Sequence, residues 1–153
     1  MRAVVQRVLN ASVSVENIVK GKIDNGFLVY LGVAHNDNNT DADWLAEKIP
    51  NLRIFDDNDG KMNLSLKDLL SEGLNVGVLA ISQFTLMGET RKGRRPSWDM
   101  AAQPEKAKQL YKYFIEAIKN QQIKCESGEF QAHMMVSYTN DGPVTIILDT
   151  KIT

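Results

Sequence analysis

The stretch NGFLVYLGVA, residues 25–34, decides the fold class because it joins a tight-turn signal to an unbroken apolar run. Asn-Gly pairs favour the two-residue turns of β-hairpins. A short apolar run without alternation is typical of a strand that is buried on both faces. Upstream, residues 4–8 and 12–16 are predicted to be strands with Asn10 in the turn between them, and residues 18–23 form a possible third strand. The first third of the chain is therefore expected to be mainly β and to open with a hairpin.

Two helices are predicted among the later strands. Thr40 and Asp43 resemble a capping box before a helical apolar pattern that Pro50 stops. Pro104 starts a longer amphipathic pattern. The apolar positions of that second helix are Ala107, Leu110, Tyr111, Phe114, Ile115 and Ile118. Further strands are expected at residues 76–82, 123–129, 134–138 and 144–148, and the last two are separated by the turn-like residues 140–143. Strands in this number, with only two main helices, favour an α+β fold with an antiparallel or mixed barrel-like sheet over a parallel βαβ fold.

Composition narrows the classes of function. The 153 residues, 43% of them hydrophobic, suit one domain over residues 1–153. Because 18 basic side chains nearly balance 19 acidic ones, any contact with RNA must be local. The lone Cys125 and the two histidines, His35 and His133, are too few for a recognisable zinc site, and no glycine-rich phosphate loop occurs. We therefore expect no metal and no cofactor. With neither a signal peptide nor a membrane span in the sequence, a cytoplasmic location without a membrane partner is expected.

Hydroxyl nucleophiles are present at a strand end, but a partner base is hard to find. Ser82 and Thr85 follow the apolar strand at residues 76–82. The GxSxG elbow is absent, and neither histidine lies in a triad context. Cys125 is expected to be a packing residue, and both histidines are expected to serve at the surface or in hydrogen bonding. The acidic segment at residues 56–60 lacks the ligand spacing of a calcium loop and is predicted to be a turn.

Two short motifs are less easily explained by packing. Ser82-Gln83-Phe84-Thr85-Leu86 interrupts an apolar strand with polar residues that need partners. Asn140-Asp141-Gly142-Pro143-Val144-Thr145 would be an ordinary turn if it stood alone. Together they resemble the two signature motifs of the D-aminoacyl-tRNA deacylase (D-tyrosyl-tRNA deacylase) family, SQFTL and NxGPVT. The opening residues 1–8, the GKMNLS segment at 60–65 and the loop at 92–104 also look like that family.

The resemblance implies a homodimer whose active site lies at the subunit interface and whose substrate is an aminoacyl-tRNA. In the family, a cis Gly-Pro peptide from one subunit enters the site of its partner, and here Gly142 and Pro143 match it. Their backbone carbonyls would exclude the side chain of an L-residue and accept a D-residue. Glycine has no side chain to exclude, so glycyl-tRNA, including glycine mischarged on tRNA(Ala), is also an expected substrate. Arg7 would orient the segment by donating to backbone carbonyls, with Asn140 and Thr145 in support.

For hydrolysis, the resemblance suggests that backbone N–H groups near Phe84 and Thr85 hold the oxyanion. The 2′-hydroxyl of the terminal adenosine would then help to activate water, with Thr85 as a covalent nucleophile in the rival mechanism. Ser82, Gln83 and Phe84 would shape the pocket for the adenosine and the amino acid. The basic residues Arg91, Lys92, Arg94 and Arg95 would meet acceptor-stem phosphates. Two further alternatives stay open, which are a non-catalytic tRNA-binding module and an esterase with a threonine or serine nucleophile.

The chain departs from the family pattern after Phe130. Gln131 stands where the family usually has glycine, and His133 stands where an acidic residue is frequent. Both motifs remain intact, so these differences bear on the lining of the pocket and on substrate preference more than on the reaction.

Overall fold

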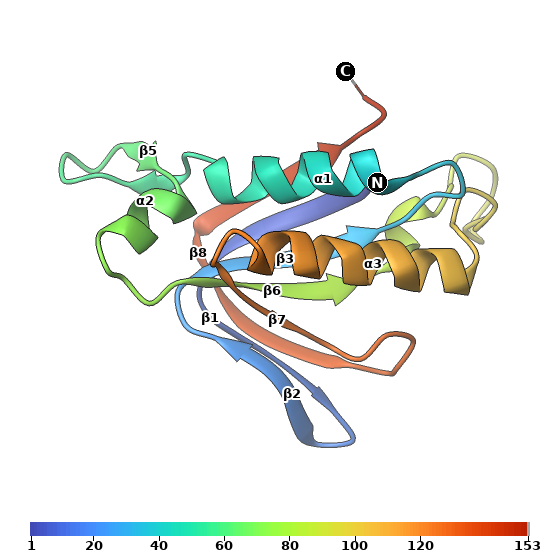
Figure 1. Cartoon of the computed structure of the whole chain (residues 1–153). Coiled ribbons are helices and arrows are strands. Elements are labelled where there is room, and N and C mark those ends of the chain that lie inside the picture. The colour runs from blue at the N-terminus through green and yellow to red at the C-terminus, as the bar shows by residue number, and fades with distance from the viewer. Residues whose placement is uncertain (153) are drawn as a thin grey trace.

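A curved mixed sheet with helices on one face forms the molecule (Figure 1). This computed structural model describes residues 1–152. The strands of the six-stranded sheet are β1 (Arg2–Val15), β2 (Ile18–Ile23), β3 (Gly26–Gly32), β6 (Gly77–Ser82), β7 (Lys124–Ser127) and β8 (Met135–Asp149). The helices are α1 (Asn39–Lys48), α2 (Leu66–Ser71) and α3 (Pro104–Lys119), with 3₁₀ turns at Ile49–Asn51 and Phe84–Met87, and a small ribbon pairs β4 (Phe55–Asp56) with β5 (Met62–Leu64). The predicted α+β class and mixed sheet are confirmed.

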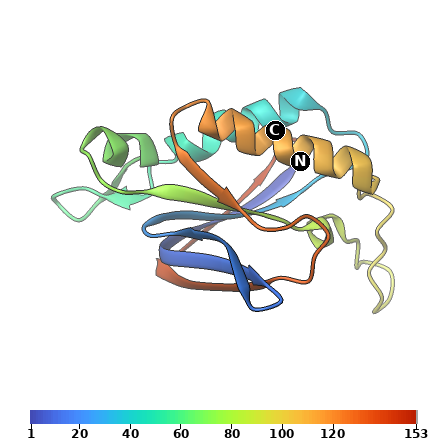
Figure 2. The ribbon, with the colours of Figure 1, turned by 60° about the horizontal axis from the view of Figure 1, so that its bottom comes forward.

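Strand order explains how the sheet is both mixed and curved. The order is β2-β1-β3-β6-β7, and β8 pairs with the other side of β1. The strand β1 is antiparallel to β2, β3 and β8, whereas β3, β6 and β7 run parallel to one another. The sheet curls until β2 approaches β7, where a Cβ on Gly21 would lie 2.8 Å from the carbonyl oxygen of Ser127 (Figure 2). A side chain at Gly21 would therefore prevent this near closure of the barrel.

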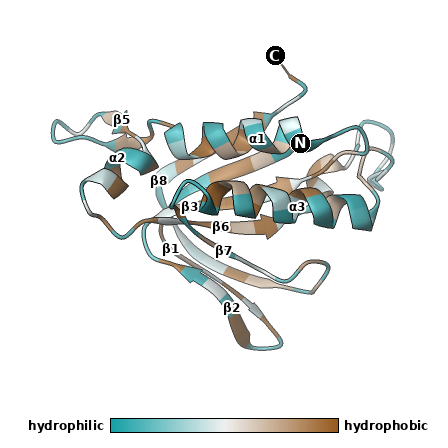
Figure 3. Cartoon of the chain, in the orientation of Figure 1, coloured by the Kyte–Doolittle hydropathy of each residue, from teal (hydrophilic) through white to brown (hydrophobic). Residues whose placement is uncertain are grey.

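The strand β3 is buried on both faces, as predicted. Phe27, Val29 and Leu31 belong to the main core beneath α1 and α3, while Leu28 belongs to a second apolar cluster inside the curl of the sheet. The helices turn their polar faces outward and their apolar faces toward the sheet (Figure 3). Each large apolar side chain buried in this way contributes about 1.5–3 kcal/mol, so β3 holds together the two halves of the core.

The predicted opening hairpin at Asn10 is wrong. The strand β1 runs through that position without a turn, and the real hairpin turn is formed by Glu16 and Asn17, both with positive φ. At Asn10 the strand changes neighbours, because residues 2–8 pair with β3 and residues 11–15 pair with β2. The polar Asn10 therefore lies where β1 changes its neighbouring strand and not where the chain reverses. The pairing of β1 with β8 is also irregular at this position.

The predicted turn between two closing strands is also wrong, because β8 is a single strand that includes residues 140–145. Val8 pairs with Asn140 and Gln6 with Thr145, so that residues 141–144 face Arg7 alone in a wide bulge. The side-chain amide of Asn140 donates to the carbonyl oxygens of Arg7 and Val144, both at 3.0 Å. These bonds bridge the gap in the ladder and keep the strand continuous. The outer edge of β8 pairs with no other strand in residues 1–152.

The residues that cap the first helix differ from the prediction. The capping box of α1 is formed by Asn38 and Asp41, not by Thr40 and Asp43. The short helix α2 was not predicted, although Ser65 and Asp68 form a second capping box at its start. No α-helix in the described part of the chain combines the length and apolar character that a membrane crossing requires.

Candidate active site

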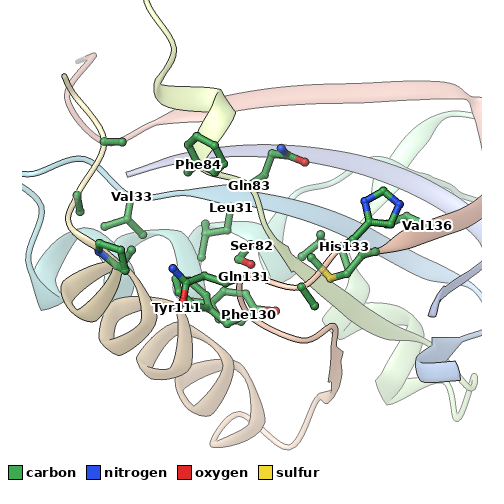
Figure 4. A pocket seen from close by; sticks show the side chains of 17 residues that line it. Leu31, Val33, Ser82, Gln83, Phe84, Tyr111, Phe130, Gln131, His133 and Val136 are labelled. Carbon is green, nitrogen blue, oxygen red and sulfur yellow. The ribbon is translucent and has the colours of Figure 1, made fainter. Parts of the chain in front are cut away.

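A pocket of about 600 Å³ opens where the parallel strands β3 and β6 end. Its floor comes from the ends of these two strands and the SQFTL motif, one wall from the first turns of α3, and the other wall from the segment between β7 and β8 (Figure 4). Its lining includes Ser82, Gln83, Phe84, Tyr111, Phe130, Gln131 and His133. The register of β3 and β6 determines the floor of the pocket. Because Leu31 pairs with Ser82, Ser82 is the residue of β6 at the end of the sheet where the pocket opens.

The SQFTL motif leaves β6 as a single 3₁₀ turn. The N–H of Gln83 still donates to the carbonyl of Leu31 at 2.9 Å, and the turn begins at the next residue. The first N–H groups of a helical turn have no partner within it. Those of Phe84 and Thr85 donate to no other group in the described residues 1–152. The side-chain amide of Gln83 donates to the hydroxyl of Thr85. The motif therefore offers two backbone donors beside the pocket.

Ionisable groups are scarce in the pocket. Of the described residues that line it, only Tyr111 and His133 have ionisable side chains, and no carboxylate or lysine is among them. The hydroxyl of Tyr111 donates to the carbonyl of Ala80 at 2.7 Å, and burial raises its pKa above the usual range. Burial likewise raises the pKa of Cys125 to about 12, so this thiol stays protonated at neutral pH. Cys125 is a packing residue, as expected, and it does not line the pocket.

The second motif lies elsewhere in the same chain. None of residues 140–145 lines the pocket. The Gly142-Pro143 peptide bond is cis, Gly142 has a φ of 116°, and both residues are exposed at the bulge of β8. The hydroxyl of Thr145 accepts a hydrogen bond from Gln6 on the neighbouring strand. One chain therefore does not bring the two motifs into one site.

Arg7 is buried beneath this bulge with 5% of its surface exposed, which excludes a solvated strand arginine. Its Nε atom lies 3.0 Å from Asp141 in an ion pair, and its Nη1 atom lies 3.4 Å from Asp56. The carbonyl to which it donates belongs to Ile54, at 2.6 Å, and no bond to the carbonyls of Gly142 or Pro143 is formed within residues 1–152. Within one chain, Arg7 thus holds Asp141, the residue next to Gly142, and its expected role in orienting the Gly142-Pro143 segment stays a prediction.

The basic loop has fewer free charges than the sequence indicates. Arg91 forms a tight ion pair with Glu89, and the hydrogen bonds from Arg91 lower the pKa of that carboxyl to about 2. Lys92, Arg94 and Arg95 are exposed and form no ion pair with any described residue. Three cations, instead of four, are thus available to an anionic partner. The part of the chain that the structure describes contains no cluster of three metal-ligating side chains.

Sequence reasoning missed much of the pocket wall. Tyr111 was predicted only as part of the helix core, yet its ring also borders the pocket. His133, expected at the surface, is exposed at the pocket edge. Gln131 has a φ of 66°, a conformation that glycine adopts most easily, which fits the family preference for glycine at this position. The departures from the family pattern at Gln131 and His133, which were expected to bear on the lining of the pocket, were the signals in the sequence that pointed to this wall.

Comparison with known proteins covers nearly the whole chain. Residues 4–149 match the sequence profile of the D-Tyr-tRNA(Tyr) deacylase family. A D-aminoacyl-tRNA deacylase from Thermosipho africanus (strain TCF52B) is 59% identical over 99% of this chain and 98% of that protein. A D-aminoacyl-tRNA deacylase from Thermotoga petrophila (strain ATCC BAA-488 / DSM 13995 / JCM 10881 / RKU-1) is 53% identical over the same shares. Among solved structures, the c-Myc DNA Unwinding Element Binding Protein has a TM-score of 0.89 at 36% identity and covers 98% of this chain and 99% of that chain.

Proposed function

Because this chain belongs to the D-Tyr-tRNA(Tyr) deacylase family, we propose that it hydrolyses the ester bond between a D-amino acid and tRNA. The enzyme is a hydrolase that acts on carboxylic ester bonds. The observation that carries the proposal is the SQFTL turn, which has free backbone donors at Phe84, a lining residue of the pocket of about 600 Å³, and at Thr85 next to it in the chain. Such a pocket suits a terminal adenosine with an attached amino acid. We place the activity in the cytoplasm, where aminoacyl-tRNA is used.

The chemistry assigned to the pocket depends on the backbone. The N–H groups of Phe84 and Thr85 would stabilise the oxyanion that forms when water attacks the ester carbonyl, and one such donor contributes about 3–4 kcal/mol in other acyl-transfer enzymes. No carboxylate borders the pocket, and Tyr111 stays protonated because its pKa is raised by burial. The 2′-hydroxyl of the terminal adenosine is the group that we propose to assist the attacking water. Neither a metal nor a cofactor enters this mechanism.

Selection against L-amino acids would come from a second copy of the chain. Gly142 and Pro143 are exposed and absent from the pocket of their own chain, so they are free to enter the pocket of a partner. Their carbonyls would occupy the space that the side chain of an L-residue needs. Arg7 supports this segment through its ion pair with Asp141, while Asn140 bridges the bulge. Glycyl-tRNA, including that mischarged on tRNA(Ala), would pass this filter because glycine has no side chain.

The proposed homodimer has physical support in the exposed face of β8. Ile147 on this strand is 69% exposed, and Met135 and Leu9 are exposed apolar side chains on the same pair of strands. Exposed large apolar side chains on a strand whose outer edge is unpaired are typical of a surface that a partner covers. Contact with the acceptor stem is assigned to Lys92, Arg94 and Arg95, with Arg91 in a weaker role because Glu89 neutralises it.

The decisive experiment incubates the purified protein with D-tyrosyl-tRNA, L-tyrosyl-tRNA and glycyl-tRNA(Ala). We expect release of D-tyrosine and glycine above the spontaneous rate, and no release of L-tyrosine. Heat-denatured protein provides the control for spontaneous hydrolysis. If none of the three is deacylated, the chain is a tRNA-binding module and the enzymatic proposal fails. Equal hydrolysis of D- and L-tyrosyl-tRNA would support the hydrolase proposal but contradict the proposed selection against L-amino acids.

A further inference from the structure

An exposed pair of aromatic rings lies at the mouth of the pocket. The rings of Phe84 and Trp98 meet edge to face, with their centroids 5.1 Å apart and their planes at 66°. Although they contact each other, Phe84 is 57% exposed and Trp98 is 41% exposed. Phe84 lines the pocket, whereas Trp98 does not. The pair therefore continues the aromatic surface from the pocket out onto the basic loop.

Trp98 is held in place by the backbone on both sides. Before it, Glu89 and Ser97 exchange two backbone hydrogen bonds of 2.9 Å, which close the base of the basic loop. After it, the N–H of Ala101 donates to the carbonyl of Trp98, also at 2.9 Å. The indole ring lies over the Cα atom of Gly88, where an added Cβ would be only 2.8 Å from Cζ3 of Trp98. An exposed ring that is fixed in this way costs little conformational entropy when it binds a flat ligand.

Charge beside the ring indicates the class of that ligand. The loop closed by Glu89 and Ser97 carries Lys92, Arg94 and Arg95, which have no ion-pair partner in residues 1–152. Aromatic rings combined with nearby cations are the usual surface for single-stranded nucleic acid, because bases stack while the cations meet phosphates.

We propose that Trp98 is the stacking site for the base of the nucleotide that precedes the terminal adenosine of the tRNA. This inference rests on the proposed function, because it assumes that the terminal adenosine occupies the pocket beside Phe84. Trp98 then acts in binding of the single-stranded 3′ end and takes no part in the chemistry. Its contribution belongs to substrates that contain at least two nucleotides.

The test compares two substrates of different length, D-tyrosyl-tRNA and D-tyrosyl-adenosine. With Trp98→Ala, we expect KM for D-tyrosyl-tRNA to rise roughly tenfold, the loss of one stacked base, while kcat stays near that of the wild type. Both constants for D-tyrosyl-adenosine should be unchanged. Trp98→Phe should restore most of the lost affinity, because it keeps an aromatic face. Trp44→Ala is the matched control, since Trp44 on α1 is 44% exposed and does not line the pocket.

Equal losses on both substrates would overturn the inference, because Trp98 would then act only by holding Phe84. An unchanged KM for D-tyrosyl-tRNA would overturn it as well. If the wild type hydrolyses neither substrate, the proposed function fails, and fluorescence decides about Trp98 separately. In Trp44→Phe, Trp98 is the sole tryptophan, and the oligonucleotide CCA should quench its emission while adenosine alone should not. No quenching by CCA would contradict the stacking site.

Discussion

At the scale of single residues, Thr85 distinguishes the two mechanisms considered for the SQFTL motif. Its side chain is exposed and bonds only to the amide of Gln83, whereas its backbone N–H is free beside the pocket. We predict that Thr85→Ala keeps turnover of D-tyrosyl-tRNA within about threefold of the wild type, because the backbone donors that carry the proposed catalysis remain. Single-turnover kinetics measure this change.

A different result for Thr85→Ala would support the covalent mechanism. Complete loss of turnover in a variant whose melting temperature matches the wild type would mean that the hydroxyl is a covalent nucleophile. Ser82→Ala is the matched comparison, since Ser82 also borders the pocket with a hydroxyl group. Both substitutions lie at surface or half-buried positions, where a loss of stability beyond about 0.5 kcal/mol is not expected.

Local chemistry explains which residues of the site could be predicted. Ser82 to Thr85 stand out because polar residues follow an apolar strand, and that signal is contained within a few positions. Tyr111 and Phe130 come to the pocket from α3 and from the segment after β7, which meet only through tertiary packing. Arg7 lies beside Gly142 through its ion pair with Asp141, yet its other partners, Ile54 and Asp56, lie on a segment that no local pattern connects to it.

At the scale of elements, Asp41 fixes the start of α1 to the residues that follow β8. Its carboxylate accepts hydrogen bonds from the hydroxyl of Thr150 at 2.6 Å and from Nζ of Lys151 at 2.8 Å. Burial raises the pKa of Asp41, but the bonds from Lys151, Thr150 and the Asn38 backbone outweigh burial and lower the pKa from 3.8 to about 2. The ionised carboxylate therefore stabilises the contact between these two elements.

The pH dependence of folding should reveal this contact. Since the folded pKa lies below the unfolded value, the stabilisation is present above pH 4 and is lost as the pH falls from about 4 to about 2. The shift corresponds to about 2 kcal/mol. We predict that Asp41→Asn unfolds with less free energy at pH 7, and that its stability falls less steeply between pH 4 and pH 2. Urea titrations at several pH values measure both effects, with Asp43→Asn as control, and parallel curves for wild type and Asp41→Asn would contradict the assignment.

The same scale shows where prediction of the fold failed. Asn10 and residues 140–143 have the composition of turns, but both lie within long strands because the pairing of β1 with three neighbours outweighs local preference. The pairing of strands across the sheet depends on residues that are far apart in the sequence, so no short segment predicts it. By contrast, the buried strand at 27–32 and the long helix from Pro104 were predicted correctly, because their patterns are strong and local. The tight hairpin turn expected at Asn25-Gly26 is wrong, because Gly26 already belongs to β3, and β2 and β3 both pair with β1 instead of with each other.

At the scale of the whole molecule, the proposed active site needs two chains. A charge on the exposed side of β8 should separate the two chains. The substitution Ile147→Lys places an ammonium group at an exposed apolar position of this strand. We predict that the wild type has twice the chain mass of 17.1 kDa in light scattering, whereas Ile147→Lys has the mass of one chain and little deacylase activity. Leu74→Lys, at an exposed apolar residue after α2, is the control and should stay paired and active. A wild type that is active at the mass of one chain would refute the two-chain site.

The unpaired outer edge of β8 also has a meaning for the fate of the polypeptide in solution. Its 15 residues of extended backbone form a template on which other strands can add. A symmetric partner closes the association at two copies, while an open, head-to-tail addition continues into a fibre. Association into a dimer would thus protect against aggregation and also complete the proposed active site. At protein concentrations below the dissociation constant of the dimer, the chain would lose both benefits together.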